Sequence, residues 1–172
     1  TLFTYTTLFR SSRVVMGQAL GVRSVSDSRT VAGATITTSH SETENEYNDV
    51  GQLTATTGWN RGETRTTNVD GTVTVTTSRG RTSYAVIWGQ SVAVRSVSDS
   101  ETDGGATLTT SHSESTYTYN DLGQLTEGTG TNWSETKTTN ADGTVVETRT
   151  DGTNVFASVW GNGSGNSAIR SV

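Results

Sequence analysis

The sequence contains no cysteine, no proline and only one lysine, Lys137. Without cysteine the chain can form neither disulfide bonds nor zinc–cysteine sites. With one lysine and an isoelectric point of about 4.9, it lacks the clustered positive charge that nucleic-acid binding needs. No apolar run approaches the roughly 20 residues of a membrane-spanning helix. We therefore expect neither nucleic acid as a partner nor a membrane span.

Apolar residues are also scarce, at 30% of the chain, and no stretch repeats them with the spacing of an amphipathic helix. Serine and threonine supply roughly a third of the residues, and the β-branched threonine favours extended backbone while remaining soluble. The net charge of −5 is too small to force disorder. The composition predicts an ordered all-β protein with no significant helix, a thin core and largely solvated sheet faces.

Internal repetition is the strongest signal in the sequence. Residues 17–88 align with residues 89–160 without a gap, at a period of 72 and with about 42 identities. Residues 1–16 resemble the tail of a preceding copy, and residues 161–172 read as a Gly/Asn/Ser linker and the start of a third copy. We therefore expect that the protein continues in both directions or that neighbouring subunits complete each other's repeats. Both alternatives imply an extended assembly.

Turn signals within each copy are dense. Asn68–Gly71 and Asn140–Gly143 place Asp-Gly between alternating runs, which predicts hairpins. We expect about six or seven short strands per repeat, arranged as a meander, a stack of hairpins or a β-solenoid. Further turns are expected at 48–51, 79–80, 103–105, 120–123 and 151–152. Strands are expected in the first copy at 21–27, 33–40, 43–48, 52–57, 63–68, 72–78 and 82–88, and 72 residues later in the second.

The predicted core is small for the chain length, so stability should depend on neighbouring repeats lying against each other. Trp88 and Trp160 align, close alternating runs and are predicted to be buried. The other predicted core residues of the first copy, with their second-copy partners, are Val22, Val25, Ile36, Tyr47, Leu53, Val73, Val75, Tyr84 and Val86.

The segments Tyr47–Thr54 and Tyr119–Thr126 resemble the signature of YD (Rhs-type) repeat proteins, in which Tyr-Asp, two variable residues, Gly, a polar residue and Leu precede a strand. Asn48 and Asn120 occupy the family's Asp position, and an Asp follows one place later. The resemblance implies a secreted or surface-exposed β-structure and transfers no active site. Its structural signature residues here are Tyr47, Asp49, Gly51, Leu53, Tyr119, Asp121, Gly123 and Leu125.

Candidate chemistry is sparse. His40 and His112 occupy one repeat position and could pair with Glu42 and Glu114 as a metal or acid–base site, although a surface histidine on a polar strand is the favoured interpretation. No nucleophile–base or paired-carboxylate pattern indicates an enzyme. The acidic turns raise calcium as a possible ligand, but they lack the ligand spacing of an EF-hand, and Asx turns explain them better. No cofactor is predicted.

Three features suggest surface contacts. Thr-x-Thr spacings at 35/37, 64/66, 72/74 and 136/138 could form hydroxyl ladders for ice or carbohydrate, but the 72-residue period shows no short coil repeat, so solvent-facing threonine is favoured. Asn132 and Asn162 lie in glycosylation sequons. Trp59 and Trp133 do not align between the copies, which suggests an exposed role in contacting sugars or a neighbouring subunit.

These features together predict a non-enzymatic structural piece of an extracellular or cell-surface fibre, sheath or adhesin. Its partners would be copies of itself or adjacent repeats, joined by repeat stacking and strand-edge pairing. The alternative is a cell-surface module that binds carbohydrate or calcium.

Overall fold

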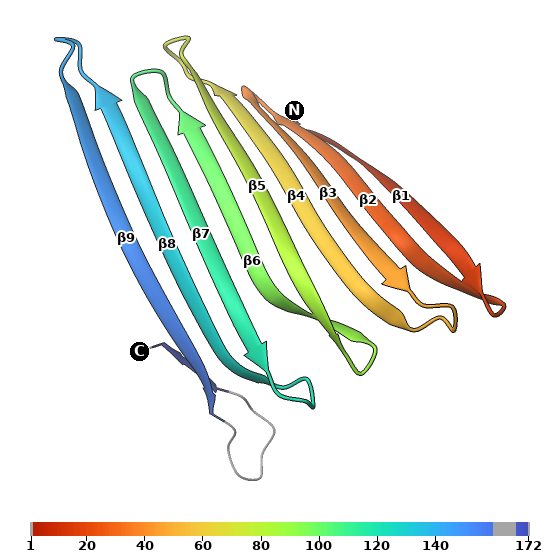
Figure 1. Ribbon diagram of the computed structural model, residues 1–172. Coiled ribbons are helices and arrows are strands. Elements are labelled where there is room, and N and C mark those ends of the chain that lie inside the picture. Colours follow the sequence, from red (N-terminus) through yellow and green to blue (C-terminus); the bar gives the residue numbers. More distant parts are fainter. Residues whose placement is uncertain (1, 160–167, 172) are drawn as a thin grey trace.

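The computed structural model describes residues 2–159 and 168–171, which form one open antiparallel sheet in a single layer (Figure 1). Each strand lies next to the strand that follows it in the chain. This meander confirms the all-β prediction, and the described residues contain no helix that could cross a membrane. The strands are β1 (Leu2–Val15), β2 (Gln18–Ala32), β3 (Thr35–Tyr47), β4 (Leu53–Thr67), β5 (Val73–Ile87), β6 (Gln90–Asp103), β7 (Thr107–Tyr119), β8 (Leu125–Thr139), β9 (Val145–Val159) and β10 (Ala168–Ser171).

A unit of four strands repeats in the sheet. Strands β2–β5 recur as β6–β9, and β1 precedes β2 as β5 precedes β6. The register repeats as well: Thr7 pairs with Asp27, as Arg79 pairs with Asp99. Even the irregularity after Ser11 in β1 recurs after Ser83 in β5. Each 72-residue unit therefore extends the same sheet sideways.

The prediction of six or seven strands per repeat is wrong, because the strands are 13 to 15 residues long from β1 to β9. The turns predicted at 79–80 and 151–152 lie inside β5 and β9. Their glycines serve another purpose: a Cβ at Gly80 or Gly152 would collide with the side chain of Asn60 or Asn132 on the adjacent strand. These glycines make room for a neighbouring side chain, and the strand continues through them.

The other predicted turns are present. In the Asn48–Gly51 turn, Gly51 N donates to Asn48 O at 3.0 Å, and Gly51 has a φ of 82°. Three further tight turns, centred on Met16-Gly17, Gly33-Ala34 and Trp88-Gly89, were not predicted; the strand predicted at 33–40 begins at Thr35 instead. Met16 and Trp88 have φ values of 50° and 53°. Positive φ at both central residues is the conformation that matches the twist of two-residue hairpins, although it usually selects Asn or Gly.

Almost nothing is fully buried. Val15, at 7% exposure, is the one apolar residue in the buried class among those whose side chains the structure describes. The predicted core residues of the first copy are half-buried, except Trp88, which is 82% exposed and was wrongly placed in the core. Trp160 lies outside the described residues. A single layer has no second layer to cover its side chains, so a central core cannot form.

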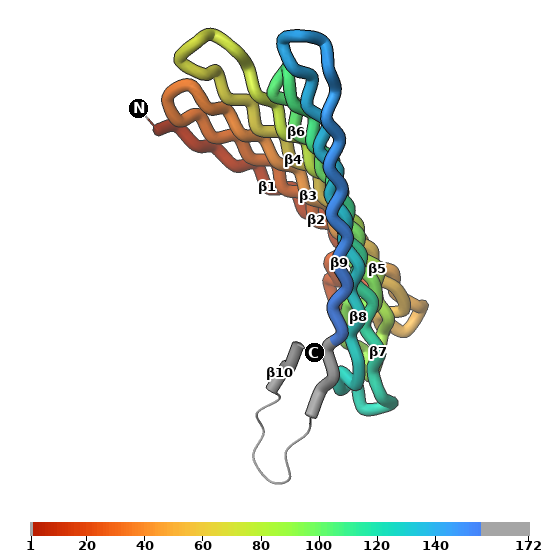
Figure 2. Tube along the Cα trace, turned by 90° about the vertical axis from the view of Figure 1, so that its left-hand side faces the viewer, coloured from red at the N-terminus to blue at the C-terminus, as the bar shows by residue number. Residues whose placement is uncertain are grey.

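The two faces differ in chemistry, because successive side chains of a strand point to opposite faces. One face carries Ser24, Ser26, Ser28 and Thr30 of β2 and the residues paired with them across the sheet; we call it the hydroxyl face. The other carries Arg23, Val25, Asp27 and Arg29 with their paired residues; we call it the charged face. Figure 2 shows the layer from its side, with the strong twist expected of a wide sheet.

Candidate functional site

A row of threonines crosses the hydroxyl face. The pairing register places one threonine of every strand from β1 to β9 in this row. Its members are Thr4, Thr30, Thr37, Thr64, Thr76, Thr102, Thr109, Thr136 and Thr148. Neighbouring hydroxyls hydrogen-bond in alternate strand pairs, at 3.2 Å between Thr4 and Thr30 and at 3.3 Å between Thr37 and Thr64. The pairs in the second half of the row have Oγ1–Oγ1 distances of 3.1 and 3.2 Å.

A second row, mainly serine, runs beside the first. It contains Thr6, Ser28, Ser39, Gly62, Ser78, Ser100, Ser111, Ser134 and Thr150. Ser28 and Ser39 hydrogen-bond at 2.7 Å, as do Ser100 and Ser111. The sequence argument did not foresee these rows, although it concerned flat arrays for ice or carbohydrate and this sheet is twisted. That argument required a short coil repeat, whereas in this meander the hairpin registers align residues that are far apart in the sequence.

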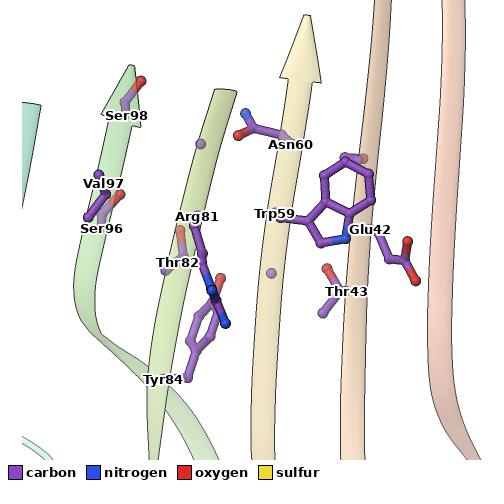
Figure 3. Close-up of a pocket in the computed structure, with 13 residues that line it drawn as sticks. Glu42, Thr43, Trp59, Asn60, Arg81, Thr82, Tyr84, Ser96, Val97 and Ser98 are labelled. Atoms are coloured by element: carbon purple, nitrogen blue, oxygen red, sulfur yellow. The ribbon is translucent and has the colours of Figure 1, made fainter. Parts of the chain in front are cut away.

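A shallow hollow of about 260 Å³ opens on the hydroxyl face across β3 to β6 (Figure 3). The side chain of Asn60 lies across Gly80, and the ring of Tyr84 lies next to Gly58, where a Cβ would be 3.5 Å from the ring. Serine and threonine hydroxyls, including that of Ser98, complete the lining from this face. From the hydroxyl face the hollow thus combines the Tyr84 ring, the Asn60 amide and several hydroxyls, a set suited to hydrogen-bonding a polar ligand. Residues assigned to the charged face, among them Glu42, Trp59 and Arg81, also line it.

The charged face carries a cluster centred on Glu42. Arg23 Nε donates a hydrogen bond to Glu42 Oε1, and the glutamate side chain is only 8% exposed. His40 Nδ1 lies 2.7 Å from Asp27 Oδ1, while His40 Nε2 lies 3.9 Å from Glu42 Oε2. Trp59 covers the histidine with its ring centroid 4.5 Å away. Glu42 is thus held mainly by Arg23, and the His–Glu pair that the sequence analysis considered but did not favour has no hydrogen bond.

The second repeat contains the same cluster. Arg95 Nε donates to Glu114 Oε1 at 2.6 Å, and His112 Nδ1 lies 2.6 Å from Asp99 Oδ1. Here the covering ring is Trp133, 6.0 Å from the His112 ring and nearly parallel to it. The guanidinium of Arg149 lies over the Trp133 ring, 5.1 Å from its centroid.

The arginines set the ionisation of these glutamates. The hydrogen bond from Arg23 lowers the pKa of Glu42 below its ordinary value of 4.5, although burial opposes this change. The hydrogen bond from Arg95 lowers the pKa of Glu114 in the same way. Both carboxylates are therefore kept ionised, as members of ion pairs. Sequence analysis missed Arg23 and Asp27, although their recurrence as Arg95 and Asp99 was a visible signal.

Trp59 and Trp133, which do not align in the sequence, have equivalent places on the charged face. Trp59 is directly paired with Glu42, whereas Trp133 is paired with His112. The two positions differ by two residues along equivalent strands, so both side chains point to the same face and reach the histidine of their own repeat. Trp59 remains 44% exposed, and Trp133 is half-buried.

The YD-like signature residues form hairpin turns. Tyr47 at the end of β3 donates from its hydroxyl to Gly21 O at 3.2 Å, and Leu53 opens β4 opposite it. Asn48 Oδ1 accepts hydrogen bonds from the backbone N of Val50 and Gln52, whereas the side chain of Asp49 is fully exposed. The second copy repeats this arrangement at Tyr119, Asp121, Gly123 and Leu125. The asparagine, at the family's Asp position, therefore closes the turn.

The remaining predicted sites are also placed. Asn132 lies on the hydroxyl face in β8, so a glycan attached there would stand on that face; Asn162 lies outside the described residues. Of the acidic turns that suggested calcium, the Asn68–Gly71 turn is satisfied internally, because Thr72 donates to Asp70 from its backbone N at 2.9 Å and its hydroxyl at 2.7 Å. These bonds lower the pKa of Asp70. Residues 2–159 and 168–171 contain no cluster of three His, Asp or Glu residues arranged to hold a metal.

No family model matches the chain, and comparison with curated proteins and solved structures found no similar one.

Proposed function

We propose that the chain is a structural segment of an extracellular β-repeat fibre, sheath or adhesin, in which 72-residue units add four strands at a time to one continuous sheet. The observation that carries this proposal is the repeated register: the β1–β2 pairing and the β5–β6 pairing coincide after a shift of 72 residues. A unit that joins its neighbour in the same way each time can be added without limit. The resemblance to YD repeat proteins is consistent with such an extended surface structure.

The edge strand β1 supports assembly by strand pairing. Among the described strands it pairs with β2 alone, whereas its equivalent β5 has a partner on both sides. Leu2, Phe3, Leu8 and Phe9 of β1 are each more than half exposed. A long edge strand with exposed apolar side chains is a site for adding another strand, since its free backbone groups and apolar surface are both covered by pairing.

Negative-stain electron microscopy of the purified chain tests this proposal. We expect ribbons or fibres for the wild type, and loss of these assemblies when Leu8→Lys and Phe9→Lys are combined in β1. The control combines Val69→Lys and Leu122→Lys, which add the same charge at exposed apolar residues in turns and should leave the assemblies intact. Dispersed particles in every wild-type preparation would contradict the proposal.

The hollow beside Asn60 and Tyr84 favours a second candidate function, binding of neutral carbohydrate. A half-buried aromatic ring next to an amide and hydroxyls can stack on a sugar ring, while the polar groups hydrogen-bond the sugar hydroxyls. A glycan array probed with the wild type and with Tyr84→Ala tests this candidate. Binding that is lost in the variant would support it, and equal signals from both proteins would exclude this hollow as the site.

A further inference from the structure

The two repeats allow the two faces to be compared within one chain. Each face of each four-strand unit has 20 positions between the β-bulges and the opposite turns, five on each strand. On the hydroxyl face 14 of these 20 positions carry the same residue in both repeats: four of five on each of the first three strands and two of five on the fourth. On the charged face 8 of 20 are the same: three, three, two and none of five. The hydroxyl face is therefore the more constrained.

The nature of the differences strengthens this contrast. The hydroxyl face changes between small uncharged residues at five of its six differing positions; the sixth is Thr74/Val146. The five are Ala32/Gly104, Thr43/Ser115, Gly62/Ser134, Ser78/Thr150 and Thr82/Asn154. On the charged face, Arg29 is replaced by Glu101 and Arg79 by Asp151, so the charge reverses. A solvated face tolerates such reversals, whereas a face in contact with a uniform partner surface does not.

We propose that the hydroxyl face docks against the hydroxyl face of a second copy of the chain, which gives a two-layer ribbon. This inference rests on the proposed function as an assembling β-repeat and specifies the surface by which the sheets stack.

Hydroxyl chemistry makes this face complementary to itself. Each serine or threonine hydroxyl can both donate and accept a hydrogen bond, so two such surfaces can pair without needing opposite charges. From β2 to β9 the rows of this face contain no charged residue. The net charge of −5 is therefore carried mainly by the other face and the turns, and it is kept away from the contact. Docking through the charged face would instead remove many ions from water, which is costly.

Shape and area also favour a second copy. The eight strands from β2 to β9, about 4.8 Å apart and each contributing nine residues that rise about 3.4 Å, give a face of roughly 1,000 Å². A stable interface needs about 800 Å² from each partner, so the face is large enough. Small side chains allow the layers to approach to about 10 Å or less, and two sheets with the same twist pack with their strands about 30° apart. A twisted copy of the same sheet meets this requirement, whereas a flat crystalline surface does not.

Adjacent threonines on β3 and β7 provide a matched test. Thr37→Lys with Thr109→Lys places two charges in the threonine row, while Thr38→Lys with Thr110→Lys places them one residue away on the charged face. Both pairs of substitutions lie in β3 and β7, at positions that remain accessible to solvent. Circular dichroism checks that each variant keeps its β-structure. Atomic force microscopy then measures ribbon thickness, and sedimentation measures the mass of the soluble form.

We expect ribbons about two layers thick, roughly 20 Å, for the wild type and the 38/110 variant, and about one layer, roughly 10 Å, for the 37/109 variant. One-layer ribbons in all three proteins would overturn the inference and leave the proposed function intact. Two-layer ribbons in the 37/109 variant, or wild-type one-layer ribbons that thicken only when a neutral polysaccharide is added, would also overturn it. The absence of any ribbon or dimer in all three proteins would overturn the proposed function as well.

Discussion

The Arg–Glu–His–Asp cluster occurs in both repeats, but the two copies are covered differently. In the first repeat Trp59 lies opposite Glu42, and the glutamate side chain is 8% exposed. In the second repeat Thr131 occupies that place, Trp133 lies two residues further on, and the Glu114 side chain is 30% exposed. The charged face therefore keeps its interactions without keeping the residue at each position, since side chains two residues apart share a face.

Removing the glutamate should give the largest difference in stability between the two clusters. We expect Glu42→Ala to lower Tm by several degrees and Glu114→Ala by about half as much, because Glu42 is the better covered of the two and its loss exposes more of the cluster. Thermal unfolding followed by circular dichroism at pH 7 measures both effects. Equal losses would show that the position of the tryptophan does not matter.

Acid should lower the stability of the fold through the Arg23–Glu42 ion pair. The pKa of Glu42 is lower in the folded chain than its ordinary value of 4.5, so its contribution to stability is present above about pH 4.5 and is lost as the pH falls through the folded-state pKa. We expect Tm to fall between about pH 5 and pH 3, and to fall less in Glu42→Gln, which has no proton to gain. An acid dependence identical in both proteins would contradict this assignment.

The turns should behave alike in both repeats, unlike the clusters. Gly51 and Gly123 have φ values of 82° and 76°, and an added Cβ would be 3.4 Å from Leu20 and 3.5 Å from Ile87, respectively. We expect Ala at either position to cost about 1–2 kcal/mol, because left-handed backbone is unfavourable for a residue with a Cβ. Gly21→Ala is the control, since Gly21 has open space and no positive φ. Urea unfolding gives the three free energies.

Asparagine should stabilise the Met16-Gly17 turn more than the Trp88-Gly89 turn, because only Trp88 makes a side-chain hydrogen bond that the substitution removes. Met16→Asn should raise the free energy of unfolding by about 1 kcal/mol, because asparagine tolerates the left-handed conformation that methionine adopts there. Trp88→Asn should gain less, since it also removes the 2.7 Å hydrogen bond from Trp88 Nε1 to Asp121 O. Urea unfolding of both variants measures the difference, and a larger gain for Trp88→Asn would refute this explanation.

Transplanting the tryptophan should have the smallest effect. The double substitution Thr131→Trp with Trp133→Arg gives the second repeat the arrangement of the first. In this background we expect Glu114→Ala to lower Tm by about one degree more than it does in the wild type, so that its effect approaches that of Glu42→Ala. A double-mutant cycle in Tm measures this coupling, and additive effects would show that the ring does not protect the glutamate.

Sequence reasoning identified the repeat, the all-β class and the Asn/Asp–Gly turns, since these follow from local patterns. It misjudged strand length because Gly80 and Gly152 look like turn residues, and only the neighbouring Asn60 and Asn132 explain why glycine is needed inside a strand. It placed Trp88 in a core because a sequence does not show that the sheet has a single layer. It missed the partnership of His40 with Asp27 because the two residues meet only through the hairpin register.

Local sequence patterns specify the 72-residue unit, the extended backbone and the position of most turns, because β-branched residues and Asx–Gly turns act over a few neighbouring residues. The pairing of distant segments, by contrast, places one threonine from each of the strands β1 to β9 in a single row and most of the charged strand residues on the opposite face. The physical reason is the pairing register, since one residue of slip in any hairpin would send that strand's threonine to the other face.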